Sequence, residues 1–78
     1  MPTVLKIGPY RFFFYSNENN EPAHIHIQNN EKTAKFWLKP VSIASSYGFT
    51  SKELKCMNLL INENYNSIME KWNEFFSR

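Results

Sequence analysis

Two histidines, His24 and His26, are the only histidines in this chain of 78 residues, and a single residue separates them. They lie in residues 21–27 (EPAHIHI), a stretch that is typical of a β-strand. Alternation along a strand places both imidazoles on one face and the two isoleucines on the other. Histidine exchanges protons near neutral pH and is the commonest metal ligand. The pair is therefore the first candidate for chemistry in this sequence.

Acid–base cleavage of RNA is the chemistry that this pair suits best. Attack by a 2′-hydroxyl needs a general base, a general acid and a cation near the developing charge, and imidazoles with a pKa of about 6.5 suit both proton transfers. The sequence therefore predicts His24 and His26 as catalytic residues. Basic residues would hold the phosphate and aromatic residues would stack bases, which predicts contacts from Arg11, Phe13, Tyr15, Lys35 and Trp37.

A non-catalytic module that binds a companion protein is the alternative hypothesis. Residues 12–15 are four aromatic residues in a row, so at least two of them face away from a core on one side of the sheet. Exposed apolar surface of that kind often marks an interface. Under this hypothesis the histidines are ordinary solvated strand residues, and the protein is not an enzyme.

The sequence predicts neither a metal nor a cofactor. Two histidines on a strand can chelate one ion, but further ligands would have to come from Glu18, Glu21 or a second subunit. The chain has no aspartate, which excludes Asp pairs and Ser-His-Asp triads. Its single cysteine, Cys56, falls in a predicted helix, where such a residue is usually a small hydrophobe rather than a nucleophile.

Four strands in two hairpins are expected to position these side chains. Residues 3–7 and 10–16 read as strands joined by Gly8-Pro9, and residues 23–28 and 31–38 as strands joined by Asn29-Asn30. A polar loop with Pro22 separates the hairpins.

Pairing across these turns sorts the side chains onto two faces. It sets His26 opposite Thr33 and His24 opposite Lys35. One face is then basic and aromatic, with His24, His26, Arg11, Phe13, Tyr15, Thr33, Lys35, Trp37 and Lys6. The other is apolar, with Leu5, Ile7, Tyr10, Phe12, Phe14, Ile25, Ile27, Ala34, Phe36 and Leu38. This placement predicts that neither histidine is buried within the monomer.

A helical segment is predicted to cover the apolar face. Thr50 and Glu53 form a capping-box pattern, so a helix begins there. Apolar residues then recur at steps of three and four: Leu54, Met57, Ile61, Tyr65, Ile68, Trp72 and Phe75. The polar run 62–67 is poor in helix formers, so one helix or a pair of helices fits the pattern.

Length and composition indicate one small α+β domain: a sheet over residues 1–39, a connector over 40–49 and a helical segment over 50–77. Seven Phe, four Tyr and two Trp exceed what a disordered chain carries. A domain this small buries a modest share of its surface, which leaves a homodimer open. The net charge is +2, and residues 1–49 hold five lysines and arginines against three glutamates.

The sequence predicts a cytoplasmic protein. Residues 1–6 lack the apolar core of a signal peptide, and no apolar run approaches the roughly 18–20 residues of a membrane span. One cysteine forms no internal disulfide, which also fits a reducing compartment.

Four segments together resemble a known family. They are residues 12–16 (FFFYS), 21–27 (EPAHIHI), 34–38 (AKFWL) and 72–76 (WNEFF), and the likeness extends to the opening Met-Pro-Thr. The chain resembles the small bacterial family catalogued as domain of unknown function 4160. One departure is Ala23, where the family commonly has a second proline.

The resemblance implies a companion protein but no particular catalytic activity. Such proteins are encoded beside another small domain, and a toxin–antitoxin type of pairing has been proposed for them. His24 and His26 fall on the family's signature positions, which carry no established role. The combined expectation is a toxin–antitoxin-like component that acts on nucleic acid, most plausibly RNA. Acid–base cleavage by the His24 and His26 pair is the preferred mechanism, beside non-catalytic contact with nucleic acid.

Overall fold

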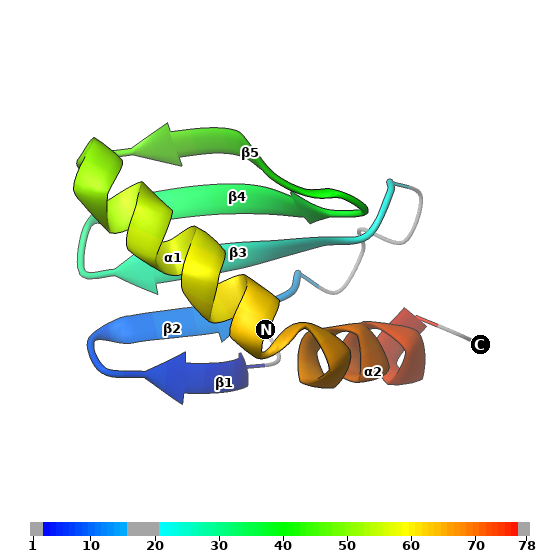
Figure 1. Ribbon diagram of the computed structural model, residues 1–78. Helices are drawn as coiled ribbons and strands as arrows, with labels where there is room; N and C mark the ends of the chain where they lie inside the picture. Colours follow the sequence, from blue (N-terminus) through cyan, green and yellow to red (C-terminus); the bar gives the residue numbers. More distant parts are fainter. Residues whose placement is uncertain (1–2, 16–20, 77–78) are drawn as a thin grey trace.

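Five antiparallel strands form one open sheet whose order in space follows the chain, and two helices come after it (Figure 1). This computed structural model describes residues 3–15 and 21–76. The elements are β1 (Thr3–Ile7), β2 (Tyr10–Phe13), β3 (His24–Asn29), β4 (Lys32–Leu38), β5 (Val41–Tyr47), α1 (Ser51–Glu63) and α2 (Tyr65–Phe76). The α+β class with an antiparallel sheet is confirmed, but the sheet has one strand more than the four predicted.

The fifth strand lies in the segment expected to be a connector. Pro40 ends β4 as predicted, but Lys39 and Pro40 form a two-residue turn that returns the chain along β4. The sequence does not predict this strand because three serines and an alanine interrupt its apolar pattern. A bulge at Ala44 also breaks the alternation, since Phe36 pairs with Ile43 whereas Lys35 pairs with Ser45.

The first hairpin has the predicted register, with Ile7 opposite Tyr10 and Leu5 opposite Phe12. Gly8 begins the turn at φ 56°, a left-handed conformation that glycine adopts without steric cost. β2 ends at Phe13, earlier than predicted, and Ser16 lies outside the described residues.

The second hairpin turns one residue later than predicted. Asn29 pairs with Lys32, so the loop is Asn30-Glu31, and Asn30 takes the left-handed φ of 57°. The pairing therefore shifts by two positions: His26 faces Lys35, and His24 faces Trp37. A shift of two preserves the face of every side chain, because the side-chain period of a strand is also two.

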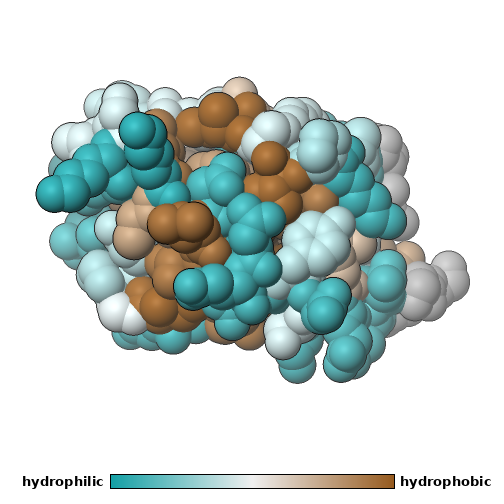
Figure 2. Space-filling model, in the orientation of Figure 1, coloured by the Kyte–Doolittle hydropathy of each residue, from teal (hydrophilic) through white to brown (hydrophobic). Residues whose placement is uncertain are grey.

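The core lies between the predicted apolar face of the sheet and the two helices. Large side chains from the sheet are almost fully buried there, and each contributes about 1.5–3 kcal/mol relative to an exposed position. The sheet supplies Phe12, Phe14, Ile25, Ile27, Ala34, Phe36 and Leu38, and the helices supply Met57, Ile61, Ile68 and Trp72. Figure 2 shows the helix side, where apolar patches reach the surface between polar side chains.

The capping box fixes where α1 begins. The backbone N–H of Glu53 donates to the Thr50 hydroxyl over 3.1 Å, and the backbone N–H of Thr50 donates to the Glu53 carboxylate over 2.9 Å. Lys32 at the start of β4 also donates to this carboxylate, over 3.4 Å. These contacts lower the pKa of Glu53, and the largest effect comes from the hydrogen bond with the Thr50 backbone.

Asn64 divides the helical segment into two helices, within the polar run. Its side-chain amide donates to the carbonyl of Leu60 over 2.9 Å, and its backbone N–H donates to the same carbonyl over 3.1 Å. Such local bonds compete with continuation of a helix. α2 then lies beyond the ends of β1 and β2 (Figure 1), where Trp72 packs on Phe14 with 5.1 Å between ring centroids. No helix in residues 3–15 and 21–76 has the length and apolar character needed to cross a membrane.

Candidate functional site

The open face of the sheet, opposite the helices, arranges its side chains in rows that cross the strands. Directly opposed residues on neighbouring strands share a face, so the register defines each row. The central row runs over four strands and comprises Phe13, His26, Lys35 and Ser45. On one side of it lies a row of Lys6, Arg11, Gln28, Thr33 and Tyr47, and on the other a row of His24, Trp37 and Ser42.

A hollow of about 280 Å³ lies over the central row. Four of the predicted site residues line it, and they are joined by hydroxyl groups from β4 and β5. These lining side chains include Phe13, Tyr15, His26, Thr33, Lys35, Ser45 and Tyr47. We call this feature the open-face hollow. Its lining combines an imidazole, a lysine side chain and phenol rings, which suits an anionic and aromatic ligand.

His26 lies at the centre of an aromatic cluster within the open-face hollow. Its ring is half-buried, with the Tyr15 ring edge-on at 4.6 Å and the Phe13 ring stacked at 5.5 Å between centroids. The ring of His24 meets it edge-on at 5.2 Å. These neighbours fix the orientation of the His26 imidazole while the hollow leaves it open to solvent.

His24 is fully buried, so the prediction that neither histidine is buried was wrong for this residue. It begins β3 at the end of the sheet, where α2 brings the Trp72 ring to 5.2 Å and the opposite residue Trp37 lies at 5.8 Å. Its Nδ1 lies 2.8 Å from the carbonyl oxygen of Pro22. Alternation assigned the correct face, but it gave no sign that α2 would cover that end of the strand.

Lys35 is the cation of the open-face hollow, and Glu21 holds it. Its ammonium group donates to the Glu21 carboxylate over 2.8 Å, and lies 4.6 Å from the centre of the Trp37 ring. The same carboxylate oxygen is 3.8 Å from Nδ1 of His24. Glu21 therefore links the lysine beside His26 to the buried histidine.

Arg11 and Trp37 flank the open-face hollow without lining it. The Arg11 guanidinium lies 4.4 Å from the centre of the Phe13 ring and donates to the Gln28 side chain over 3.3 Å. Phe13 is consequently only 3 % exposed, whereas Trp37 is half-buried beneath Lys35. The structure thus gathers four of the seven predicted site residues around the hollow and leaves His24 buried in the neighbouring row.

Tyr47 is the lining residue that sequence reasoning missed. It is the last residue of β5, lies opposite Thr33 and is 72 % exposed. Val41 and Ile43 pair with core-facing residues, so strict alternation would place Tyr47 on that face too. The bulge at Ala44 reverses this and places Tyr47 on the open face. A run of Val-x-Ile followed by Tyr is the only signal, and it indicates a strand without locating its bulge.

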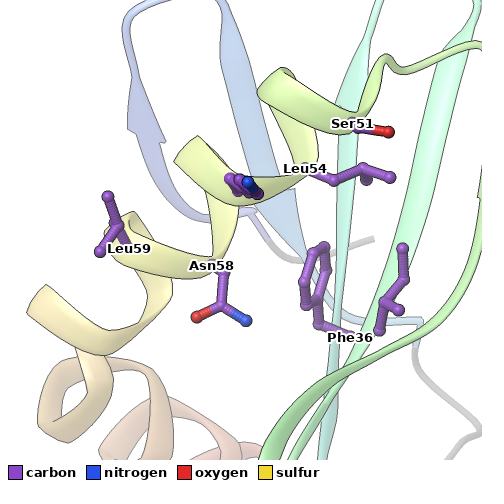
Figure 3. A pocket seen from close by; sticks show the side chains of 7 residues that line it. Phe36, Ser51, Leu54, Asn58 and Leu59 are labelled. Atoms are coloured by element: carbon purple, nitrogen blue, oxygen red, sulfur yellow. The ribbon is translucent and has the colours of Figure 1, made fainter.

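A larger groove of about 510 Å³ lies on the helix side, between α1 and the edge formed by β4 and β5 (Figure 3). Its walls are mostly apolar, with Phe36, Ile43, Leu54 and Leu59, and Lys55 is its only titratable residue. Leu54 and Asn58 project from α1 toward the sheet, while Leu59 lies on the far side of the helix from Phe36 (Figure 3). Lys55 has no second titratable group beside it in this lining, so the greater size of the groove does not make it the better candidate for acid–base chemistry.

Acidic, histidine and cysteine side chains do not gather elsewhere in the described structure. Across residues 3–15 and 21–76, no three of them lie close enough together to hold a metal ion. Glu18, one of the ligands considered from the sequence, lies outside these ranges. Cys56 is exposed on α1.

Comparison with known proteins gives a family. The model of the family described as Domain of unknown function (DUF4160) matches residues 10–73, most of the chain. The protein therefore belongs to this family, as its sequence motifs indicated. No curated protein and no solved structure matches the chain.

Proposed function

We propose that this protein acts on RNA through the open face of its sheet, as the toxin-like member of a bacterial toxin–antitoxin-like pair in the cytoplasm. The observation that carries the proposal is the central row, in which His26 and Lys35 lie directly opposite each other and both line the open-face hollow. Phosphodiester cleavage by a 2′-hydroxyl can use this pair if one imidazole acts first as the general base and then as the general acid, beside a cation.

The chemistry assigns His26 and Lys35 separate tasks. A ring nitrogen of His26 takes the proton of the attacking 2′-hydroxyl, the 2′-oxygen bonds to phosphorus, and the bond to the 5′-oxygen breaks. The imidazolium so formed returns its proton to the departing 5′-oxygen, which balances the step. The Lys35 ammonium stabilises the extra negative charge on the phosphoryl oxygens while the two bonds exchange.

His24 acts as a positioning residue in this scheme. Because it is fully buried, no substrate reaches its ring, and direct proton transfer with RNA falls to His26. Its edge-on contact with His26 and its bond to Pro22 hold the imidazole of the neighbouring row in place. The sequence-based idea of two equivalent catalytic histidines is thereby refined to one reacting ring and one supporting ring.

The covered aromatic rings favour RNA over the protein-binding alternative on this face. Phe13 lies beneath Arg11 and Trp37 beneath Lys35, so cations rather than bare rings meet the solvent at both positions. A surface of cations interleaved with aromatic rings suits a polyanion that also carries flat bases. Binding of a companion small protein and homodimer formation stay predictions.

Cleavage of a fluorescent RNA by the purified protein tests the proposal. We expect His26→Ala to slow cleavage by about 10²- to 10⁴-fold, the usual contribution of one general acid–base group. Leu59→Ala, an exposed apolar change on the helix side, is the matched control and should cleave at the original rate. Absence of cleavage by the wild-type protein, together with no growth inhibition when it is expressed, would sink the enzymatic proposal.

A further inference from the structure

Two exposed tyrosines border the open-face hollow, and they come from strands on opposite sides of it. Tyr15 follows the end of β2 and is 40 % exposed, and Tyr47 ends β5 and is 72 % exposed. His26 on β3 and Lys35 on β4 lie between these strands. Exposed rings beside a cation and a proton-transfer group are placed to contact a ligand rather than to stabilise the core.

The spacing of the sheet shows what the two tyrosines can hold. His26 and Tyr47 lie two strands and one row apart, and strand spacings of about 4.8 Å and row spacings of about 6.8 Å put their Cα atoms about 12 Å apart. The Tyr15 ring packs against His26. A ring sandwiched between two others needs only about 7 Å between the outer rings, two contacts of about 3.5 Å. This backbone separation favours one base on each tyrosine over one base enclosed between the two rings.

We propose that Tyr15 and Tyr47 each stack on one base of an unstacked dinucleotide, and that the phosphate joining the two nucleotides lies over His26 and Lys35. This inference rests on the proposed function and names its substrate as single-stranded RNA. It accounts for both tyrosines with one ligand, and it puts the bond to be cleaved beside the groups that act on it.

The same spacing favours an unpaired strand over a base-paired substrate. Neighbouring bases in a stacked strand lie about 3.4 Å apart along the axis. Two tyrosines whose backbones are separated by several times that distance each hold one base when the two bases are unstacked. An unpaired strand unstacks its bases at little cost. The side chains of Thr33 and Ser45, which also line the hollow, supply hydroxyl groups that suit hydrogen bonds to base edges or the 2′-hydroxyl.

The bulge at Ala44 is what places Tyr47 on the open face. If the strand kept strict alternation through Ala44, Tyr47 would fall on the face that carries α1, and the open-face hollow would lose its tyrosine on β5. Bulges commonly redirect a side chain beside a functional site. Here the redirected side chain is the most exposed of the large apolar residues in the described structure.

Binding measurements on stacking variants test the inference. The probe is a labelled 2′-O-methyl RNA of about twelve nucleotides, within the range of sheet-based sites, because it lacks the nucleophile and is not cleaved. The same strand annealed to its complement is the second probe, and polyphosphate is the competitor. Fluorescence anisotropy compares Tyr15→Ala, Tyr47→Ala, Tyr15→Phe and Tyr47→Phe, with Leu59→Ala as the control on the helix side.

We expect the wild-type protein to bind the single strand at least about tenfold more tightly than the duplex. Each change to alanine should weaken that binding by about five- to 100-fold, the usual effect of removing one stacking ring, while each change to phenylalanine should preserve it. Equal binding of single strand, duplex and polyphosphate would reduce the site to an anion contact and overturn the inference.

The cleavage assay separates this inference from the proposed function. If cleavage depends on His26 but the alanine variants of Tyr15 and Tyr47 bind and cleave like the wild type, the proposed function stands and the dinucleotide assignment is lost. If neither RNA binding nor cleavage occurs in any variant, both are lost. If cleavage is retained on single strands only and falls with each alanine change, both are supported.

Discussion

The ring of His24 lies 5.2 Å from the ring of Trp72, and this contact joins the candidate site to the last helix of the fold. Trp72 also packs on Phe14, so one indole covers both the end of the core and the start of β3. The two histidines are consequently unequal. His24 is buried and packs against His26, whereas His26 lines the open-face hollow.

Chemical labelling should distinguish the two histidines directly. A reagent that acylates accessible imidazoles should modify His26 in the folded wild-type protein and leave His24 untouched, because only His26 lines the hollow. Mass spectrometry of peptides would locate the label. The His26→Ala variant should then take up no label on histidine until it is unfolded in denaturant. Equal labelling of both positions in the folded state would contradict the burial of His24.

The two histidines should also differ in their effect on stability. His24→Ala removes a fully buried ring from contact with two tryptophans and should lower the free energy of unfolding by about 2–4 kcal/mol. His26→Ala removes a half-buried ring and should cost about 1 kcal/mol or less. Urea unfolding followed by tryptophan fluorescence measures both. Similar midpoints for the two variants would show that His24 is not the structural member of the pair.

Much of the candidate surface follows from alternation alone. The faces assigned to Arg11 and Phe13 on one hairpin, and to Lys35 and Trp37 on the other, agree with the strand register. Tyr15 lines the open-face hollow, although β2 ends before it. They hold although the second turn lies one residue later than predicted, because a shift of two positions keeps each side chain on its face. The capping box likewise locates the start of α1, since it is a local pattern with a local cause.

What alternation missed depends on non-local structure. The burial of His24 results from Trp72, a residue 48 positions later in the chain that was assigned only to the apolar stripe of a helix. Tyr47 reached the open face through a bulge, and the pairing partner on β4 determines where a bulge occurs. Alternation of side-chain types predicts the face on which a residue lies, but it does not predict which other element covers the end of the strand.

Lys35 should contribute a measurable share of the salt dependence of RNA binding. A lysine that neutralises one phosphate of a single strand contributes about 0.7 to the slope of log K against log salt. Lys35→Ala should therefore reduce the slope by about that amount, whereas Lys52→Ala, an exposed change on α1, should leave it unchanged. Titrations at several salt concentrations measure the slope, and an equal effect of the two variants would remove Lys35 from the binding surface.

Glu21 should oppose that binding, because its carboxylate accepts a hydrogen bond from Lys35 over 2.8 Å and competes with phosphate. Glu21→Gln removes the negative charge and should tighten binding of the uncleavable single strand at low salt. The gain should shrink as salt screens the charge. The double change Glu21→Gln with Lys35→Ala is the matched control, and a similar gain in that background would show that the effect does not pass through the lysine.

Glu53 should make the stability of the fold fall in acid. Its pKa lies below the ordinary value of 4.5, chiefly because it accepts a hydrogen bond from the Thr50 backbone, and also because Lys32 lies close. A carboxyl whose pKa is lowered by folding stabilises the folded state above its unfolded pKa, and this contribution disappears as the pH falls through the folded pKa. Glu53→Gln should thus unfold at a lower denaturant concentration than the wild type at pH 7, and the two should converge in acid below that lowered pKa.

Glu70→Gln, on the exposed surface of α2, is the control and should follow the wild type throughout. A difference for Glu53→Gln that persists unchanged in strong acid would mean that the charge of this carboxyl is not what stabilises the start of α1.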